Sequence, residues 1–314
     1  MRSSHLVSCC LVASIAMLLA ARGATAANIA INFTQNWTTI ANWPGANAAE
    51  QATNQMRATN DVLQAKDNWE AAITDNFNMT VTVDWALPFA FGNNSSEVCG
   101  VGGVENSQIV GGVTKPLASR IIFNRTLQNW FFDPTPATHE EYDSVPNEPW
   151  RGTAKPNGPA KNKVDLVSCA KHELGHALGF LYGVGGLGGN GQFAPYIAEV
   201  ADGDIDVNDF GGIALNVGAL NMINSASHFS AIGNVPDPAL LVAVPMKDLL
   251  MVPEAGPAGD ERTVMSPYDV SAVAKILGLP LGIGYNLTPK GTVPEPAAAS
   301  VALVAMCLLR SRRH

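Results

Sequence analysis

The sequence predicts an α+β fold that combines several strands with a long helix and a shorter second helix. Residues 46–72 are rich in Ala, Gln and Asn and contain no Gly or Pro, which is typical of a long helix. Residues 79–85 alternate strictly between apolar and polar side chains, which is the period of a strand. Residues 165–180 are apolar and rich in Ala and Leu, which indicates a second helix.

The other elements are weaker but follow a simple order. Strands are expected at residues 28–33 and 119–124. Loop or turn chemistry predicts irregular structure at residues 92–96, 130–136 and 146–159. A last helix is expected at residues 270–277, ending at Gly278. Few regular signals follow residue 183, so the C-terminal half is expected to be irregular.

The N-terminus has the three parts of a secretory signal peptide. Arg2 precedes a mostly apolar run, residues 6–21, and Ala24-Thr25-Ala26 supplies a small-residue cleavage site. The sequence therefore predicts that residues 1–26 are a signal peptide. A buried N-terminal helix is the alternative.

The C-terminus carries a second targeting pattern. Pro294-Glu295-Pro296 precedes an apolar run, residues 297–309, which is short for a full membrane span, and three arginines follow: Arg310, Arg312 and Arg313. This order resembles the PEP-CTERM sorting signal of exported bacterial proteins. The resemblance implies that residues 293–314 contact the membrane and an exosortase-type sorting machinery. It also implies a location at the bacterial cell surface, in the outer envelope or outside the cell. A simple membrane anchor is the alternative.

Composition narrows the function of the body, residues 27–292. The 314-residue chain carries a formal net charge of −8, and the two ends remove five arginines but one glutamate, so the body is more acidic still. No basic run of five or more occurs, which argues against nucleic acid as a partner. Cys99 and Cys169 are the only cysteines of the body. They are too few for a cysteine-based zinc site, and in an exported protein they could form one disulfide.

A metal-binding pattern lies in the second helix. His172, Glu173 and His176 form H-E-x-x-H, and the two histidines fall one turn apart on one face. Both rings can reach one zinc ion, which lowers the pKa of a bound water to about 7, and Glu173 can take a proton from that water. Gly179 lets the backbone leave the helix with a positive φ, so a third ligand can come from the following segment.

The stretch from His172 to Phe180, HELGHALGF, resembles the H-E-x-x-H-x-x-G motif of the metzincin zinc peptidases. Tyr182 stands where the short form of that motif has its third histidine. Leishmanolysin-like metzincins share this departure, because an inserted segment separates their glycine from a later histidine. The resemblance implies a zincin fold with an N-terminal half to about residue 182, in which the long helix backs a mixed sheet and the H-E-x-x-H helix follows. An insertion and a C-terminal half would follow in residues 183–292.

The resemblance also indicates the remaining site residues. It implies that His228 is the third zinc ligand and that Met251 forms the methionine turn below the zinc, with Met265 as the alternative turn residue. Glu199 lies at about the distance at which gluzincins place a third ligand, and His139 is a further alternative. Ordinary loop and core packing would also account for His228 and for either methionine.

Two further features are open to more than one interpretation. Tyr182 could line the substrate pocket or stabilise an oxyanion, or it could simply pack at the helix end. An acidic run could bind Ca²⁺ through Asp202, Asp204, Asp206 and Asp209, although its EF-type loop is incomplete. A solvated acidic loop is the alternative.

Together these patterns predict an exported zinc-dependent metalloendopeptidase that hydrolyses peptide bonds of a protein or peptide substrate with Glu173 as general base. The alternative is a degenerate, non-catalytic zincin domain that acts as a surface or matrix binding protein. The presence of Glu173 beside both histidines favours the enzyme.

Overall fold

The computed structural model describes most of the N-terminal half of the body and short parts of the rest: residues 27–73, 77–86, 98–127, 129–145, 148–180, 234–236, 243–245, 251, 260–266, 269–270, 273–274 and 277–278. The predicted signal peptide and the predicted sorting segment lie outside these residues. In the described part of the chain, no helix combines the length and hydrophobicity that crossing a membrane requires.

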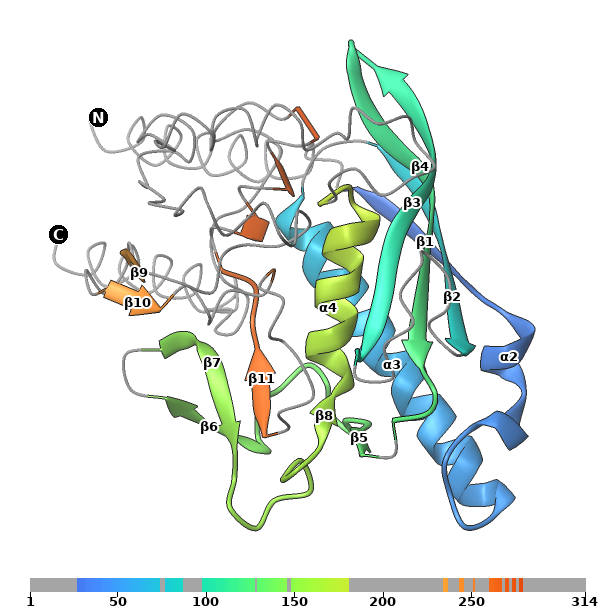
Figure 1. Ribbon diagram of the computed structural model, residues 1–314, viewed down its shortest axis with the longest axis vertical. Helices are drawn as coiled ribbons and strands as arrows, with labels where there is room; N and C mark the ends of the chain where they lie inside the picture. Colours follow the sequence, from blue (N-terminus) through green and yellow to red (C-terminus); the bar gives the residue numbers. More distant parts are fainter. Residues whose placement is uncertain are drawn as a thin grey trace, which may run out of the picture.

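The main sheet has four strands in the order β1-β2-β4-β3. Their bounds are β1 Asn28–Phe33, β2 Asn78–Ala86, β3 Gly100–Val110 and β4 Val113–Asn124. β1, β2 and β4 run parallel, whereas β3 is antiparallel to β4 and forms one edge (Figure 1). Gly111 and Gly112 join β3 to β4 with positive φ, as a tight hairpin turn requires.

Two helices lie on the same side of this sheet, α3 Ala48–Ala72 and α4 Leu166–Ala177 (Figure 1). Asn47 caps α3, because its side chain accepts hydrogen bonds from the backbone N–H groups of Ala49 and Glu50. Trp69 of α3 donates its indole N–H to the carbonyl of Lys171 in α4 over 2.8 Å. On the sheet side, Ser119 of β4 donates to the carbonyl of Ala177 over 2.7 Å. α4 is therefore held from both sides.

The core at one end of the sheet is built from stacked aromatic rings. Trp43 and Trp85 stack with ring centroids 4.3 Å apart, and Trp37 packs edge-on against both. Trp37 belongs to the short helix α2, Gln35–Thr38, and a 3-10 helix follows at Ile40–Asn42. These large buried rings fix the position of the parallel strands relative to the chain that enters α3.

The shorter strands form three smaller sheets. β11 Glu261–Thr263 pairs with β7 Glu148–Ala154, which in turn pairs with β6 Tyr142–Val145. β5 Trp130–Phe131 pairs with β8 Val164–Asp165, and β9 Asn234–Pro236 pairs with β10 Ala243–Pro245. β8 leads directly into α4, and β11, which lies far later in the sequence, also contacts the beginning of this helix.

The expected elements at residues 28–33, 46–72, 79–85 and 165–180 correspond to β1, α3, β2 and α4 within a few residues. Two expectations were wrong. Residues 148–154 form β7 rather than a loop, because Pro149 lies near the start of the strand, beside an irregularity in its pairing with β6, and Gly152 allows Tyr142 of β6 to pack closely. Trp130 and Phe131 form β5 within the segment expected to be a turn. β3 was missed entirely, and the third expected strand is longer than 119–124 because it forms the other half of the β3–β4 hairpin.

Candidate metal centre

The N-terminal end of α4 is fixed by a side-chain cap. Asp165 accepts a hydrogen bond from the backbone N–H of Ser168 at 3.0 Å and another from the Ser168 hydroxyl at 2.6 Å. The same hydroxyl accepts from the backbone N–H of Thr263 in β11 at 2.8 Å. The cap therefore joins the start of the helix to the C-terminal part of the chain.

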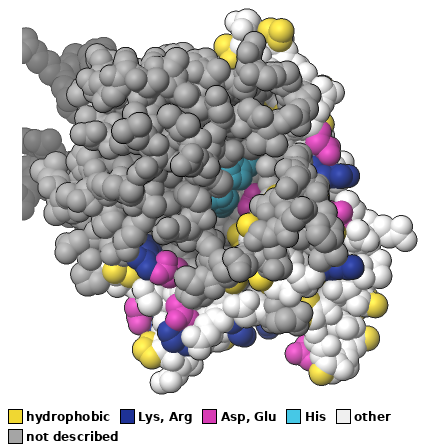
Figure 2. All heavy atoms as spheres, viewed as in Figure 1, with side chains coloured by type: hydrophobic (Ala, Val, Ile, Leu, Met, Phe, Trp, Pro, Cys, Tyr) yellow, Lys and Arg dark blue, Asp and Glu magenta, His cyan; other side chains and the backbone are white. Residues whose placement is uncertain are grey.

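His172 and His176 lie one turn apart on α4 and face one another. Their Nε2 atoms are 3.1 Å apart, and each residue exposes only 5% of its surface. Histidine side chains reach the surface near the centre of the face drawn in Figure 2, beside acidic and hydrophobic side chains. Two imidazole nitrogens on a tetrahedral zinc lie about 3.3 Å apart, so the pair is already at the spacing that a shared zinc requires.

The C-terminal end of α4 orients the second histidine. Gly179 has a φ of 108°, and the backbone N–H groups of Gly179 and Phe180 bond back to the carbonyls of His176 and Gly175. This is a Schellman arrangement, in which only the glycine position needs positive φ. It brings the Phe180 carbonyl to 2.7 Å from His176 Nδ1. A carbonyl can only accept, so Nδ1 carries the proton and Nε2 presents its lone pair to His172.

Burial and the neighbouring His172 lower the pKa of His176 to about 3. The ring is therefore neutral at physiological pH, as a metal ligand must be.

Glu173 projects from α4 towards the edge strand β3. Glycines occupy β3 where it crosses this side chain: a Cβ at Gly100 would lie 3.0 Å from Glu173 Cγ, and one at Gly102 would lie 3.1 Å from Glu173 Oε2. No described residue provides a hydrogen-bond partner for Oε2, which is buried. Burial raises the pKa of Glu173 to about 8. The side chain is therefore a carboxyl group with a raised proton affinity, as expected for a general base.

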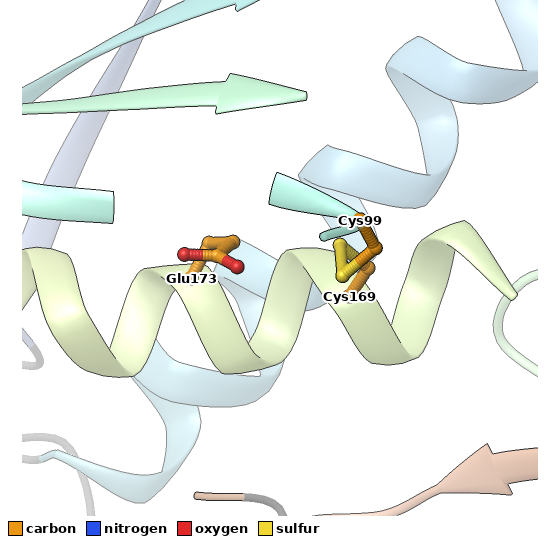
Figure 3. A group of neighbouring side chains, drawn as sticks. All are labelled: Cys99, Cys169 and Glu173. Carbon is orange, nitrogen blue, oxygen red and sulfur yellow. A yellow bond between two sulfur atoms is a disulfide. The ribbon is translucent and has the colours of Figure 1, made fainter. Parts of the chain in front are cut away.

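A disulfide ties the same strand to the same helix. Cys99, which directly precedes β3, is bonded to Cys169 of α4, and their Cα atoms are 6.5 Å apart. Cys169 lies one turn before Glu173 on the helix (Figure 3). The bridge that the sequence allowed is thus present in the structure and holds β3 across the Glu173 side chain.

Met251 packs under the middle of α4. A Cβ added to Gly175 would overlap Met251 Sδ, so the glycine is required for this close approach. The backbone N–H of Met251 donates to Asp269 at 3.0 Å, and the other carboxylate oxygen of Asp269 accepts from Ser266. Met265 is also in the core, with 5% of its surface exposed. Of the two methionines, Met251 is the one that contacts Gly175, which stands between His172 and His176 in the sequence.

A buried ionic network surrounds the beginning of α4. Arg262 of β11 donates to Asp165 at 2.7 and 3.0 Å, to Asp133 at 2.5 Å, and to the carbonyl of Thr138 at 2.9 Å. Burial alone would raise the pKa of Asp165, but the ion pair with Arg262 lowers it. Burial lowers the pKa of Lys171 to about 8, and the positive charge of Arg262 acts in the same direction.

The remaining site candidates divide into two groups. His139 lies at the ionic network, where burial and the charges of Lys171 and Arg262 lower its pKa to about 4. The others lie outside the described residues and stay predictions: His228, Tyr182, Glu199, Asp202, Asp204, Asp206 and Asp209. Within the described residues, no third His, Cys, Asp or Glu ligand atom lies within 4.8 Å of both His172 and His176.

Sequence reasoning missed several residues that act on the motif. Gly100 and Gly102 of β3 permit close approach to the helix, and Arg262 of β11 fixes its beginning. Gly175, within the motif itself, leaves room for Met251. The cluster Gly100-Val101-Gly102-Gly103 was a usable signal, because glycine inside a strand often marks a close backbone approach. Arg262 gave no local signal.

The donor set fits a zinc ion. Two imidazoles lie at the spacing of a shared tetrahedral site, and a carbonyl orients one of them. Glu173, on the same helix, has a buried carboxyl oxygen without a partner among the described residues. In comparisons with known proteins, no family model and no curated protein matches this sequence.

Proposed function

We propose that this chain is an exported zinc-dependent endopeptidase with a metzincin-like zincin fold. The observation that carries the proposal is the pair of facing Nε2 atoms of His172 and His176, 3.1 Å apart, with Glu173 on the adjoining strip of α4. Zinc, when bound, supplies a Lewis acid and lowers the pKa of a water molecule to about 7. The protein supplies the orientation and the proton transfer.

Glu173 is the proposed general base. Its buried carboxyl group has a pKa raised to about 8, so it holds a proton more strongly than an exposed glutamate does. In its ionised form it accepts a proton from the attacking water and then delivers it to the leaving amine. β3 and the Cys99–Cys169 disulfide keep bulk water away from this side chain, because Gly100 and Gly102 pack directly against it.

We propose His228 as the third ligand and Met251 as the turn methionine. The turn assignment is supported by the contact between Met251 and Gly175, which places the methionine beside the histidine-bearing turn. The Schellman turn at Gly179 supports a ligand from the following chain, because it ends the helix directly after His176.

Export is supported by the disulfide, because such bonds persist in oxidising compartments. With the predicted signal peptide of residues 1–26 and the predicted sorting segment of residues 293–314, it favours action on protein or peptide substrates outside the bacterial cytoplasm.

Zinc content and peptidase activity test the proposal together. The purified protein is expected to hold about one zinc per chain and to cleave an unfolded protein substrate. Glu173→Gln should keep the zinc and lose activity by at least about 100-fold, because a general base contributes roughly 10²–10⁴. Zinc retained together with full activity in this variant would refute the mechanism.

The third ligand is tested by His228→Ala with His139→Ala as its matched control. The first change should remove most of the zinc, and the second should leave it in place. Loss of zinc in the control instead would assign the ligand to His139. If wild-type protein binds no zinc at all, the non-catalytic binding domain becomes the better description.

A further inference from the structure

The disulfide and the proposed general base lie together at one place between α4 and β3. Cys169 and Glu173 are four residues apart and so share one face of α4, while Cys99 reaches them from the start of β3 (Figure 3). His172 and His176 lie on the neighbouring face of the same helix. The cysteine pair therefore adjoins the histidine pair but is distinct from it.

The three side chains are close enough to share one ion. The two Sγ atoms and a carboxylate oxygen of Glu173 all lie within 4.8 Å of one another, and all three residues are buried. Two thiolates on a tetrahedral zinc lie about 3.8 Å apart, given Zn–S bonds of about 2.3 Å. The Cα atoms of the cysteines are 6.5 Å apart, towards the wide end of the disulfide range, so side-chain rotation can separate the sulfurs to that distance.

We propose that reduction of Cys99–Cys169 creates a second metal site, with Cys99 Sγ, Cys169 Sγ and the Glu173 carboxylate as ligands. Its chemical preference is for divalent ions that accept thiolates, such as Zn²⁺, Cd²⁺ and Co²⁺. One position remains for water. In the oxidised chain the sulfurs are bonded to each other, and the site does not exist.

The redox step balances with a dithiol reductant. The reductant gives two electrons and two protons, the bond between the cysteines breaks, two thiols form, and the reductant closes its own disulfide. Metal binding then releases the two thiol protons to solvent.

The site has a consequence for hydrolysis, and this consequence rests on the proposed function. A metal ion that holds the Glu173 carboxylate removes it from proton transfer. Reduction in the presence of excess Zn²⁺ should therefore inhibit the peptidase, and reoxidation after removal of the excess metal alone should restore it.

Cobalt spectroscopy on a variant without the histidine pair tests the site itself. The chain carrying His172→Ala and His176→Ala, with Cys9, Cys10 and Cys307 changed to Ser, is reduced with a dithiol, freed from it by gel filtration without oxygen, and titrated with Co²⁺. Thiolate-to-cobalt charge-transfer absorption is expected at about one Co²⁺ per chain in the reduced protein and in none of the oxidised protein. This variant cannot hydrolyse peptides by the proposed mechanism, so the result is independent of peptidase activity.

Two further substitutions in this background identify the ligands. Cys99→Ser should abolish the absorption, and Glu173→Gln should weaken cobalt binding by at least about tenfold. Glu105→Gln, on the exposed part of β3, is the matched control and should change nothing. A reduced protein without the absorption would overturn the proposal. Absorption with the same affinity in Glu173→Gln would also overturn it, because an unfolded dithiol binds cobalt without the carboxylate.

Discussion

At its N-terminal end α4 is held by charges from distant parts of the chain, whereas its C-terminal end is closed mainly by its own backbone, with one added hydrogen bond from Ser119 of β4. Arg262, 97 residues after Asp165, neutralises the capping carboxylate, while Gly179 closes the other end through bonds to the preceding turn. The difference teaches that the histidine pair depends on two kinds of interaction. One requires tertiary structure, and the other is local.

Removal of Arg262 should have the largest effect on stability. Arg262→Met leaves Asp165 and Asp133 buried without their cation, so we expect the free energy of unfolding to fall by about 3–5 kcal/mol. Urea denaturation measures this change. Arg120→Met is the control, because its ion pair with Glu105 is 40% exposed on both sides and should contribute at most about 1 kcal/mol. Equal losses of unfolding free energy in the two variants would show that the buried network does not stabilise the N-terminal end of α4.

Glu173, between the two ends, is buried but lacks a charged partner among the described residues, and its effect should depend on pH. Its pKa is raised from 4.5 to about 8, so its neutral form is favoured in the folded state. The stability it provides is present below its unfolded pKa and is lost as pH rises through about 8. In metal-free protein, Glu173→Gln should therefore gain about 2–4 kcal/mol relative to wild type between about pH 4 and about pH 9.

Thermal or urea unfolding across this pH range checks the prediction, with Glu105→Gln as the exposed control. A constant difference between Glu173→Gln and wild type would contradict the burial of an uncompensated carboxyl group.

The middle of α4 also depends on a distant residue, Met251. Gly175→Ala should lower the free energy of unfolding by about 1–3 kcal/mol, because the added Cβ overlaps Met251 Sδ. Combining it with Met251→Ala should cost less than the sum of the two single changes, since the overlap is then removed. A double-mutant cycle measures this coupling. Strict additivity would mean that the two residues do not touch in solution.

The local end should give the smallest loss of stability but a measurable loss of zinc affinity. Gly179→Ala forces a side chain into positive φ, which costs about 1–2 kcal/mol, and Gly179→Asn should cost less. Displacing the Phe180 carbonyl from His176 should weaken zinc binding by about 10–100-fold. Competition with a chromophoric chelator measures the affinity. If both variants bind zinc as tightly as wild type does, the carbonyl does not orient the ring.

The same distinction explains what the sequence could predict. α4, its two histidines and the exit at Gly179 follow from a local pattern, and so do α3 and β2. β3 was missed because its glycines serve packing against Glu173, and they remove the alternating side chains by which a strand is recognised. Arg262 could not be assigned its contacts, because pairing across 97 residues leaves no periodic trace. For Met251, only the family resemblance indicated a place below the histidines, and no local pattern did. His228 and the acidic run lie outside the described residues, so their roles stay predictions.

The buried arginine also bears on how the polypeptide can be divided. Arg262 and the pairing of β11 with β7 attach the later segment to the earlier one without a covalent bond. A single cut between α4 and β11 would leave both pieces with their shared contacts. The two halves would then behave as a non-covalent complex, and the protein could be assembled from separately made fragments.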